Sequence, residues 1–176
     1  FGGRSVYGVE DKMNAQFAIN GEHSMGLGPW SSTQLRDKLT GKVMALTVDM
    51  GTYAETVSGS STPQDLESLL QLLQLHFQPA RVDTALFKAY LQRAQDAARN
   101  NAEQPDAQFA QAVNDSLFGN HPRAPEVVTP ALLASIDMER TVAIYNERFG
   151  SAQGFDFEAG QQPERRIQQA DSQERL

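Results

Sequence analysis

The sequence predicts an α+β domain in which helices pack on one face of an antiparallel-rich sheet. Two observations indicate this class. Residues 43–58 are rich in β-forming side chains and are interrupted by a turn at Met50-Gly51, which predicts a hairpin. Several other segments carry apolar residues at helical spacing and begin at residues that suit helix caps. The expected order is strand, helix, hairpin, several helices and a final strand.

The first thirty residues are Gly-rich and are expected to be irregular. One strand-like run covers residues 15–19, and Asn20-Gly21 predicts a turn after it. Ser31 and the two residues after it can cap a short helix over residues 31–39, which Gly41 ends.

The strongest helix signal begins at Thr62, which can cap a helix. Pro63 suits the first helical position, and Asp65 favours the positive end of the helix dipole. Pro79 stops this helix. Its expected core stripe consists of Leu66, Leu69, Leu70, Leu73 and Phe77.

Four more helices are expected, with starts at Asp83, near Pro105, at Thr129-Pro130 and at Asp137. Their expected core residues are Phe87, Tyr90, Leu91, Ala94, Ala98, Phe109, Val113, Leu117, Leu132, Leu133, Ile136, Met138, Val142, Tyr145 and Phe149. Gly119 closes the second of the four, and a strand is predicted over residues 154–157.

Composition divides the chain into three parts. Residues 1–30 form an irregular or partial segment, and residues 31–157 form the main domain. Residues 158–176 form a polar tail that is predicted to be disordered or solvated, or to be a junction that is not native.

Composition also excludes several classes of function. The formal net charge of −7 is scattered, and no cluster of Lys and Arg is interleaved with aromatics, so nucleic-acid binding is not expected. The chain has no Cys, which excludes disulfides, thiolate catalysis and thiolate metal ligands. No apolar run approaches the roughly 20 residues that span a bilayer.

Several features follow one another in a recognisable order. They are the hairpin over residues 43–58, the capped helix after Thr62, the break at Pro79 and the helix from Asp83. Residues 115–122 (Asp-Ser-Leu-Phe-Gly-Asn-His-Pro), a helix opening at Thr129 and residues 145–149 (Tyr-Asn-Glu-Arg-Phe) then follow. In this order, residues 31–157 resemble the pitrilysin/insulinase-type zinc peptidases, or inverzincins. The resemblance is greatest to the third of four domains in the PqqL-type zinc peptidases of Gram-negative periplasms.

The resemblance implies a periplasmic protein whose two homologous halves close around a peptide chamber. Zinc belongs to the first domain, so this chain is expected to hold no cofactor and to assist proteolysis by the zinc-bearing domain. Its implied partners are the other domains of the parent polypeptide and a peptide or protein substrate. The alternative within the same fold is a non-proteolytic scaffold, because fold alone does not decide function.

The family's zinc signature, H-x-x-E-H, places two His ligands one helical turn apart and a Glu beside the metal-bound water. Glu22-His23 resembles its second half, but Ile19 occupies the position of the first His. The helix that resembles the one supplying the family's late ligand offers only Asp96. The sequence therefore predicts no catalytic residue and no metal ligand in this chain.

The three histidines are expected to be structural. His23 is assigned to a surface loop, His76 to a half-buried helical position with local hydrogen bonds, and His121 to a loop that it helps to fix.

One substrate-binding residue is predicted, and it rests on the resemblance alone. Residues 4–9 resemble a segment of the family's second and fourth domains in which a Tyr contacts substrate, and Tyr7 matches that Tyr. The expected Arg partner falls before residue 1, and the apolar strand that the family has after Phe157 is absent. These departures predict either that part of the domain is missing from the chain or that the chain joins segments that are not adjacent in the parent.

Overall fold

The computed structural model describes residues 2–119, 121–124 and 127–160. Its elements are η1 (Arg4–Val6), α1 (Lys12–Met25), α2 (Ser32–Leu39), β1 (Met44–Met50), β2 (Glu55–Ser61), α3 (Leu66–His76), α4 (Thr84–Ala102), α5 (Pro105–Phe118), α6 (Pro130–Ala134) and α7 (Met138–Phe149). The α+β class is confirmed, with a sheet of two strands in the described part of the chain. Most of the predicted polar tail, residues 161–176, lies outside the described residues.

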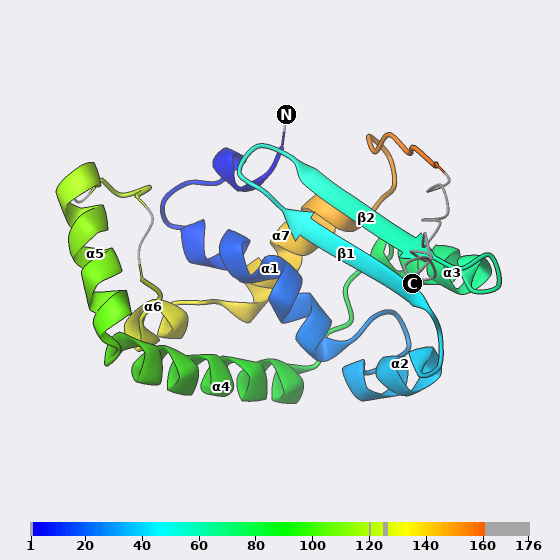
Figure 1. Ribbon diagram of the computed structural model, residues 1–176, viewed down its shortest axis with the longest axis horizontal. Helices are drawn as coiled ribbons and strands as arrows, with labels where there is room; N and C mark the ends of the chain where they lie inside the picture. Colours follow the sequence, from blue (N-terminus) through cyan, green and yellow to red (C-terminus); the bar gives the residue numbers. More distant parts are fainter. Residues whose placement is uncertain (1, 120, 125–126, 161–176) are drawn as a thin grey trace, which may run out of the picture.

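The hairpin lies against helices on one side (Figure 1). Its strands are antiparallel, with Val48 opposite Val57. Along β1, exposed residues alternate with more buried ones, and Val48 and Met50 are buried. This period of two is what a strand with one covered face requires.

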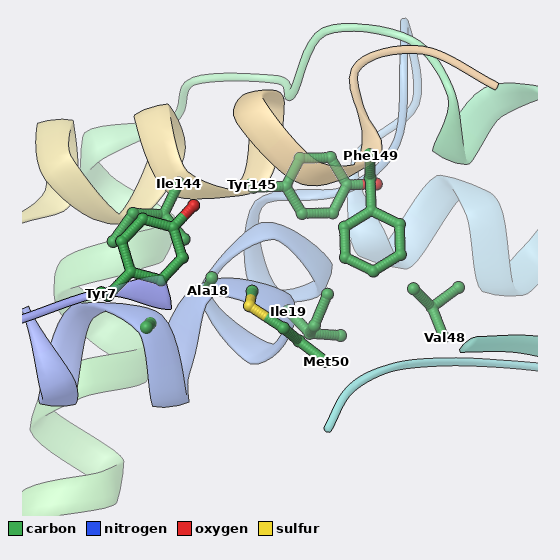
Figure 2. Close-up of a cluster of buried hydrophobic side chains, with 9 residues drawn as sticks. Tyr7, Ala18, Ile19, Val48, Met50, Ile144, Tyr145 and Phe149 are labelled. Atoms are coloured by element: carbon green, nitrogen blue, oxygen red, sulfur yellow. The ribbon is translucent and has the colours of Figure 1, made fainter. Parts of the chain in front are cut away.

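A core beneath the hairpin joins it to α1 and α7. Figure 2 shows Ile19 of α1 close to Met50 of β1, with Tyr145 and Phe149 of α7 above them in this view. The Tyr145 and Phe149 rings stack at 5.4 Å between centroids. The buried members of this core are Tyr7, Ala15, Ala18, Ile19, Val48, Met50, Ile144, Tyr145 and Phe149. Helix α1 is therefore the central element, which the hairpin and α7 both cover.

A second core lies on the other side of α1, where α4 and α6 pack. Its buried members are Met13, Met25, Phe87, Ala98, Leu133 and Ile136. The expected inward face of α4 is confirmed at Phe87 and Ala98, which are 2% and 8% exposed.

Side-chain caps begin four of the predicted helices as expected. Ser31 forms a capping box with Gln34. Asp83, Thr129 and Asp137 accept hydrogen bonds from backbone N–H groups in the first turns of α4, α6 and α7. Pro105 and Gly119 begin and end α5, the latter with a left-handed φ of 57°.

The expectation of an irregular first segment with a strand over residues 15–19 is wrong. Those residues belong to α1, and the predicted turn at Asn20-Gly21 lies inside it. The physical reason is close packing: a Cβ on Gly21 would lie 2.8 Å from Cε2 of Phe87, so the missing side chain brings α1 against α4. Glycine is tolerated in this helix because the free energy gained from close packing exceeds the helix-propensity cost of about 1 kcal/mol.

The start and the inner face of α3 also differ from the prediction. Thr62 and Pro63 form a turn before the helix, and the Thr62 hydroxyl bonds to Oδ2 of Asp65. Two residues of the expected core stripe, Leu66 and Leu70, are 48% and 53% exposed. The buried residues of α3 are Leu69, Leu72 and His76.

Two further apolar segments are not placed as predicted. Residues 154–157 form no strand; Phe155 instead packs in a loop against Phe77 at 5.0 Å between ring centroids. On α5, the expected core residues Phe109 and Leu117 are 72% and 71% exposed. Among the described residues, no helix is long and apolar enough to cross a membrane.

Candidate functional site

A Glu and two His side chains meet where the end of α1 approaches the end of α3. Glu22, His23 and His76 each offer a ligand-type atom, and these atoms lie within 4.8 Å of one another. The rings of His23 and His76 lie edge to face, with centroids 5.3 Å apart. Residues 53 positions apart in sequence are thus brought together by the packing of both helices around the core.

Glu22 is the unusual member of this cluster. It is 1% exposed, and neither of its carboxyl oxygens has a hydrogen-bond partner. Burial raises the pKa of Glu22 to about 8, because an ionised carboxylate loses its hydration in the interior. Without a bound cation, the carboxyl group is therefore mainly protonated at neutral pH.

The two imidazoles are uncharged at neutral pH. Burial lowers the pKa of His23, and burial together with the nearby His23 lowers the pKa of His76 to about 4. His23 Nε2 lies 3.6 Å from Oε2 of Glu22. Because the pKa shifts favour the neutral form of both groups, this contact is not an ion pair at neutral pH.

Tyr145 of α7 fixes the orientation of His76. Its hydroxyl donates to the backbone oxygen of His76 at 2.9 Å, and its oxygen lies 3.3 Å from His76 Nδ1. The single hydroxyl proton is committed to the carbonyl, so Nδ1–H must donate to the phenol oxygen. The neutral His76 ring then carries its lone pair on Nε2.

A cavity of about 460 Å³ opens beside the cluster. Its wall is mainly apolar, with Arg36 as a cationic group. The lining residues include His23, Leu35, Arg36, Leu39, Leu72 and His76. Both imidazoles therefore border this cavity, whereas the buried Glu22 is not among the residues that line it.

The H-x-x-E-H zinc signature does not fit these residues. Ile19 is 8% exposed and packs in the core with Tyr145 and Phe149, so an apolar side chain fills the position of the first His. Asp96 on α4 is exposed and pairs with Arg99 at 3.1 Å. The H-x-x-E-H arrangement with a late acidic ligand is thus not reproduced.

The structure corrects the placement of two histidines. His23 lies on α1 rather than in a surface loop. His76 is 4% exposed rather than half-buried, and its ring bonds to α7, not to its own neighbourhood. His121 lies in an exposed loop, where Nδ1 accepts a hydrogen bond from the Arg123 backbone at 3.2 Å. Sequence reasoning treated each histidine separately because the contacts between them are long-range.

Tyr7, the predicted substrate contact, is 7% exposed and lies beside Ile144 in Figure 2. It is not a member of the Glu22 cluster. Its hydroxyl donates to Oε2 of Glu147 at 2.8 Å and accepts from Nε of Arg148 at 3.0 Å. Arg140 lies over the ring, 5.6 Å from its centroid, and joins Glu147 to Asp11. The phenol is thus part of a polar network that ties residues before α1 to α7.

Comparison with known proteins shows a likeness at the level of the fold. No protein-family model matches the sequence, and no curated protein matches it at a significant level. Among solved structures, the chain is similar to the ferredoxin protease FusC, solved as a mutant in complex with Arabidopsis ferredoxin, with a TM-score of 0.60 and 19% identity. The match covers 83% of this chain and 16% of that chain. At this identity, the likeness establishes a shared fold with one part of the larger protein.

Proposed function

We propose that the chain is a non-catalytic domain of a periplasmic zinc metalloendopeptidase. In this role it forms part of the substrate chamber and assists peptide hydrolysis by a separate zinc-bearing domain. The observation that carries the proposal is the fold likeness to the protease FusC. The matched region is 16% of the FusC chain. A unit of this relative size suits one domain of a multidomain peptidase.

The side chains around α1 support a non-catalytic role. Ile19 fills the position at which the family signature requires a His, and it is buried in the core with Val48 and Phe149. A polar ligand at this position would lose apolar packing and would need its own hydrogen-bond partners.

The contribution of such a domain is positioning. A peptidase chamber accelerates hydrolysis when it holds the peptide near the metal-bound water and excludes solvent. Within the described residues, each strand of the hairpin pairs with the other strand alone, so each has an outer edge with unpaired backbone groups. Such edges accept an extended peptide or a strand from a neighbouring domain.

Reconstitution tests the proposal. The chain and the zinc-bearing half of its parent are purified separately, and cleavage of a quenched fluorescent peptide is measured for each and for the mixture. The chain alone should be inactive, whereas the mixture should exceed the zinc-bearing half by at least about tenfold in kcat/KM. Fractionation of cells that express the parent should place it in the periplasm.

The matched control is Ala18→Pro, which breaks α1 at a fully buried position. This variant should not increase cleavage. If the unmodified chain also fails to increase cleavage, or if both chains increase it equally, the peptidase role is contradicted and the scaffold role of the same fold is favoured.

A further inference from the structure

The Glu22 carboxyl group is buried against two imidazoles without any hydrogen bond of its own. An unpaired buried carboxyl is costly, and buried polar groups in folded proteins nearly always have partners. The imidazole of His23 offers it only Nε2, at 3.6 Å from Oε2. Because that contact is too long for a hydrogen bond, the carboxyl group needs a partner that the fold itself does not supply.

The three side chains match the preferences of a zinc-type cation. Two imidazole nitrogens and one carboxylate oxygen form a ligand set that is common for Zn²⁺, with metal–ligand distances of about 2.0–2.2 Å. Two ligands of a tetrahedral ion at that range are about 3.4 Å apart. The 3.6 Å from His23 to Glu22 is close to this value, and all three ligand atoms lie within 4.8 Å of one another. Binding of a tetrahedral ion would therefore require side-chain rotations that bring the more distant atoms closer, and the side chain of His23, 42% exposed, has room to rotate.

His76 already has the orientation of a metal-binding imidazole. Its Nδ1–H is held by the phenol oxygen of Tyr145 at 3.3 Å, which leaves the Nε2 lone pair available. Metal-binding histidines typically donate their second ring N–H to such a partner, which fixes the tautomer and the ring plane.

From these observations we propose that Glu22, His23 and His76 bind one Zn²⁺ ion per chain. The fourth ligand is a water molecule or an exogenous group from the adjacent cavity, which both histidines line. This ligand set differs from H-x-x-E-H, because the second His comes from α3 and the Glu is itself a ligand. The site links α1 to α3 and is assigned metal binding, not hydrolysis. It is an alternative to the sequence-based expectation of a chain without metal ligands.

The site is independent of the proposed function. Metal binding is a property of this chain alone, whereas the chamber role is measured through cleavage by another domain. A negative result in one experiment therefore leaves the other proposal unaffected.

Metal titration of the full chain, purified without a polyhistidine tag and treated with chelator, tests the proposal. Isothermal titration with Zn²⁺ should give one site per chain. Co²⁺ should give the strong visible absorption of a tetrahedral ion with nitrogen and oxygen ligands. Zn²⁺ should also raise the Tm of the chain, since it binds the folded state.

Four variants identify the ligands. His23→Gln, His76→Gln and Glu22→Gln should each weaken binding at least about tenfold and abolish the cobalt spectrum. His121→Gln is the matched control, because it removes an exposed histidine outside the cluster and should leave both signals unchanged. His23→Gln keeps the result interpretable if a buried substitution unfolds the chain, because its side chain is 42% exposed.

Two outcomes would overturn the proposal. One is the absence of saturable one-to-one binding by the unmodified, folded chain. The other is binding that the folded His23→Gln variant retains in full, or that His121→Gln weakens equally, either of which would place the ion elsewhere.

Discussion

The hydroxyl of Tyr145 bonds twice to a single residue, His76, donating to its carbonyl at 2.9 Å and accepting from its Nδ1 at 3.3 Å. This pair connects α7 to the last residue of α3 across the core. Both residues are buried, at 0% and 4% exposure, so solvent cannot replace either bond. The contact therefore fixes both the end of α3 and the tautomer of its last side chain.

Tyr145→Phe should lower the free energy of unfolding by about 2 kcal/mol. The ring keeps its stacking on Phe149, but two hydrogen bonds are lost and His76 keeps a buried donor without a partner. Urea unfolding followed by circular dichroism measures the loss. Tyr53→Phe is the matched control, since Tyr53 is 69% exposed and its change should stay within about 0.5 kcal/mol. Equal losses for both variants would contradict the structural role given to the Tyr145 hydroxyl.

Glu22 should make the metal-free chain less stable as the pH rises. Its pKa is about 8 in the folded state against 4.5 for an unperturbed glutamate, so the folded chain binds more protons between those values. Stability from this group is thus complete below pH 4.5 and is lost as the pH rises through 8. The neighbouring histidines, His23 and His76, titrate mainly at lower pH because their pKa values are depressed.

Glu22→Gln removes this titration and is the test of it. Relative to the unmodified chain, the variant should gain roughly 3 kcal/mol between about pH 5 and pH 8. Urea unfolding of both chains with chelator present, at several pH values, measures the difference. A difference that does not change with pH would show that Glu22 is not held protonated in the fold.

Gly21→Ala should destabilise the chain although alanine is the better helix former. The added methyl group would lie 2.8 Å from Cε2 of Phe87 and 3.1 Å from Cγ2 of Thr141. Overpacking of this kind costs about 1–3 kcal/mol, against a propensity gain of about 1 kcal/mol. The middle of the overpacking range, about 2 kcal/mol, less the propensity gain of about 1 kcal/mol, leaves an expected net loss near 1 kcal/mol in thermal or urea unfolding. Gly160→Ala, with nothing within 4 Å of the added atom, is the control.

Local signals predicted those parts of the fold that local interactions determine. Caps at Ser31, Asp83, Thr129 and Asp137 identified helix starts because the capping bond lies within the first turn. The hairpin was found from its β-forming residues and a turn, although β2 extends to Ser61, beyond the predicted end at residue 58.

The first helix was missed because glycines outweighed its pattern. Ala15, Ala18, Ile19 and Glu22 recur at helical spacing, and all four are buried. Glu22 itself broke the apolar pattern, since a carboxyl group is not expected on a core face. The same carboxyl group marks the candidate site. A Glu at a position that helical spacing places on the core face was therefore the signal that sequence reasoning missed.

The meeting of His23 with His76 had no local signature. It depends on how α1, α3 and α7 pack together, and Tyr145, which orients His76, lies 69 residues further along the chain. The prediction of a buried stripe on α5 failed for the opposite reason. Phe109 and Leu117 have the helical spacing of a core face, but spacing does not show whether another element covers that face.

Tyr7→Phe separates the predicted substrate contact from a structural role. In the unmodified chain, the Tyr7 hydroxyl donates to Glu147, so a substrate carbonyl would have to replace that carboxylate as the acceptor. If it does so, the phenol stabilises developing negative charge, and loss of one such donor costs about 10²–10³ in rate. In the reconstituted peptidase, Tyr7→Phe should lower kcat/KM at least about tenfold. The chain itself should lose about 1 kcal/mol of stability, since both hydroxyl bonds disappear.

Glu147→Gln is the matched control for Tyr7→Phe, because it disturbs the same network and keeps the phenol. Glu147 is 47% exposed at its side chain, so the amide can rehydrate and still accept the hydroxyl proton. Cleavage by the Glu147→Gln protein should stay within about threefold of the unmodified rate, as an exposed polar exchange outside the chemistry allows. Equal losses of cleavage in both variants would assign the effect to the network that joins Tyr7 to α7. An unchanged rate for Tyr7→Phe would remove Tyr7 from the substrate site and leave its phenol with the structural bonds to Glu147 and Arg148.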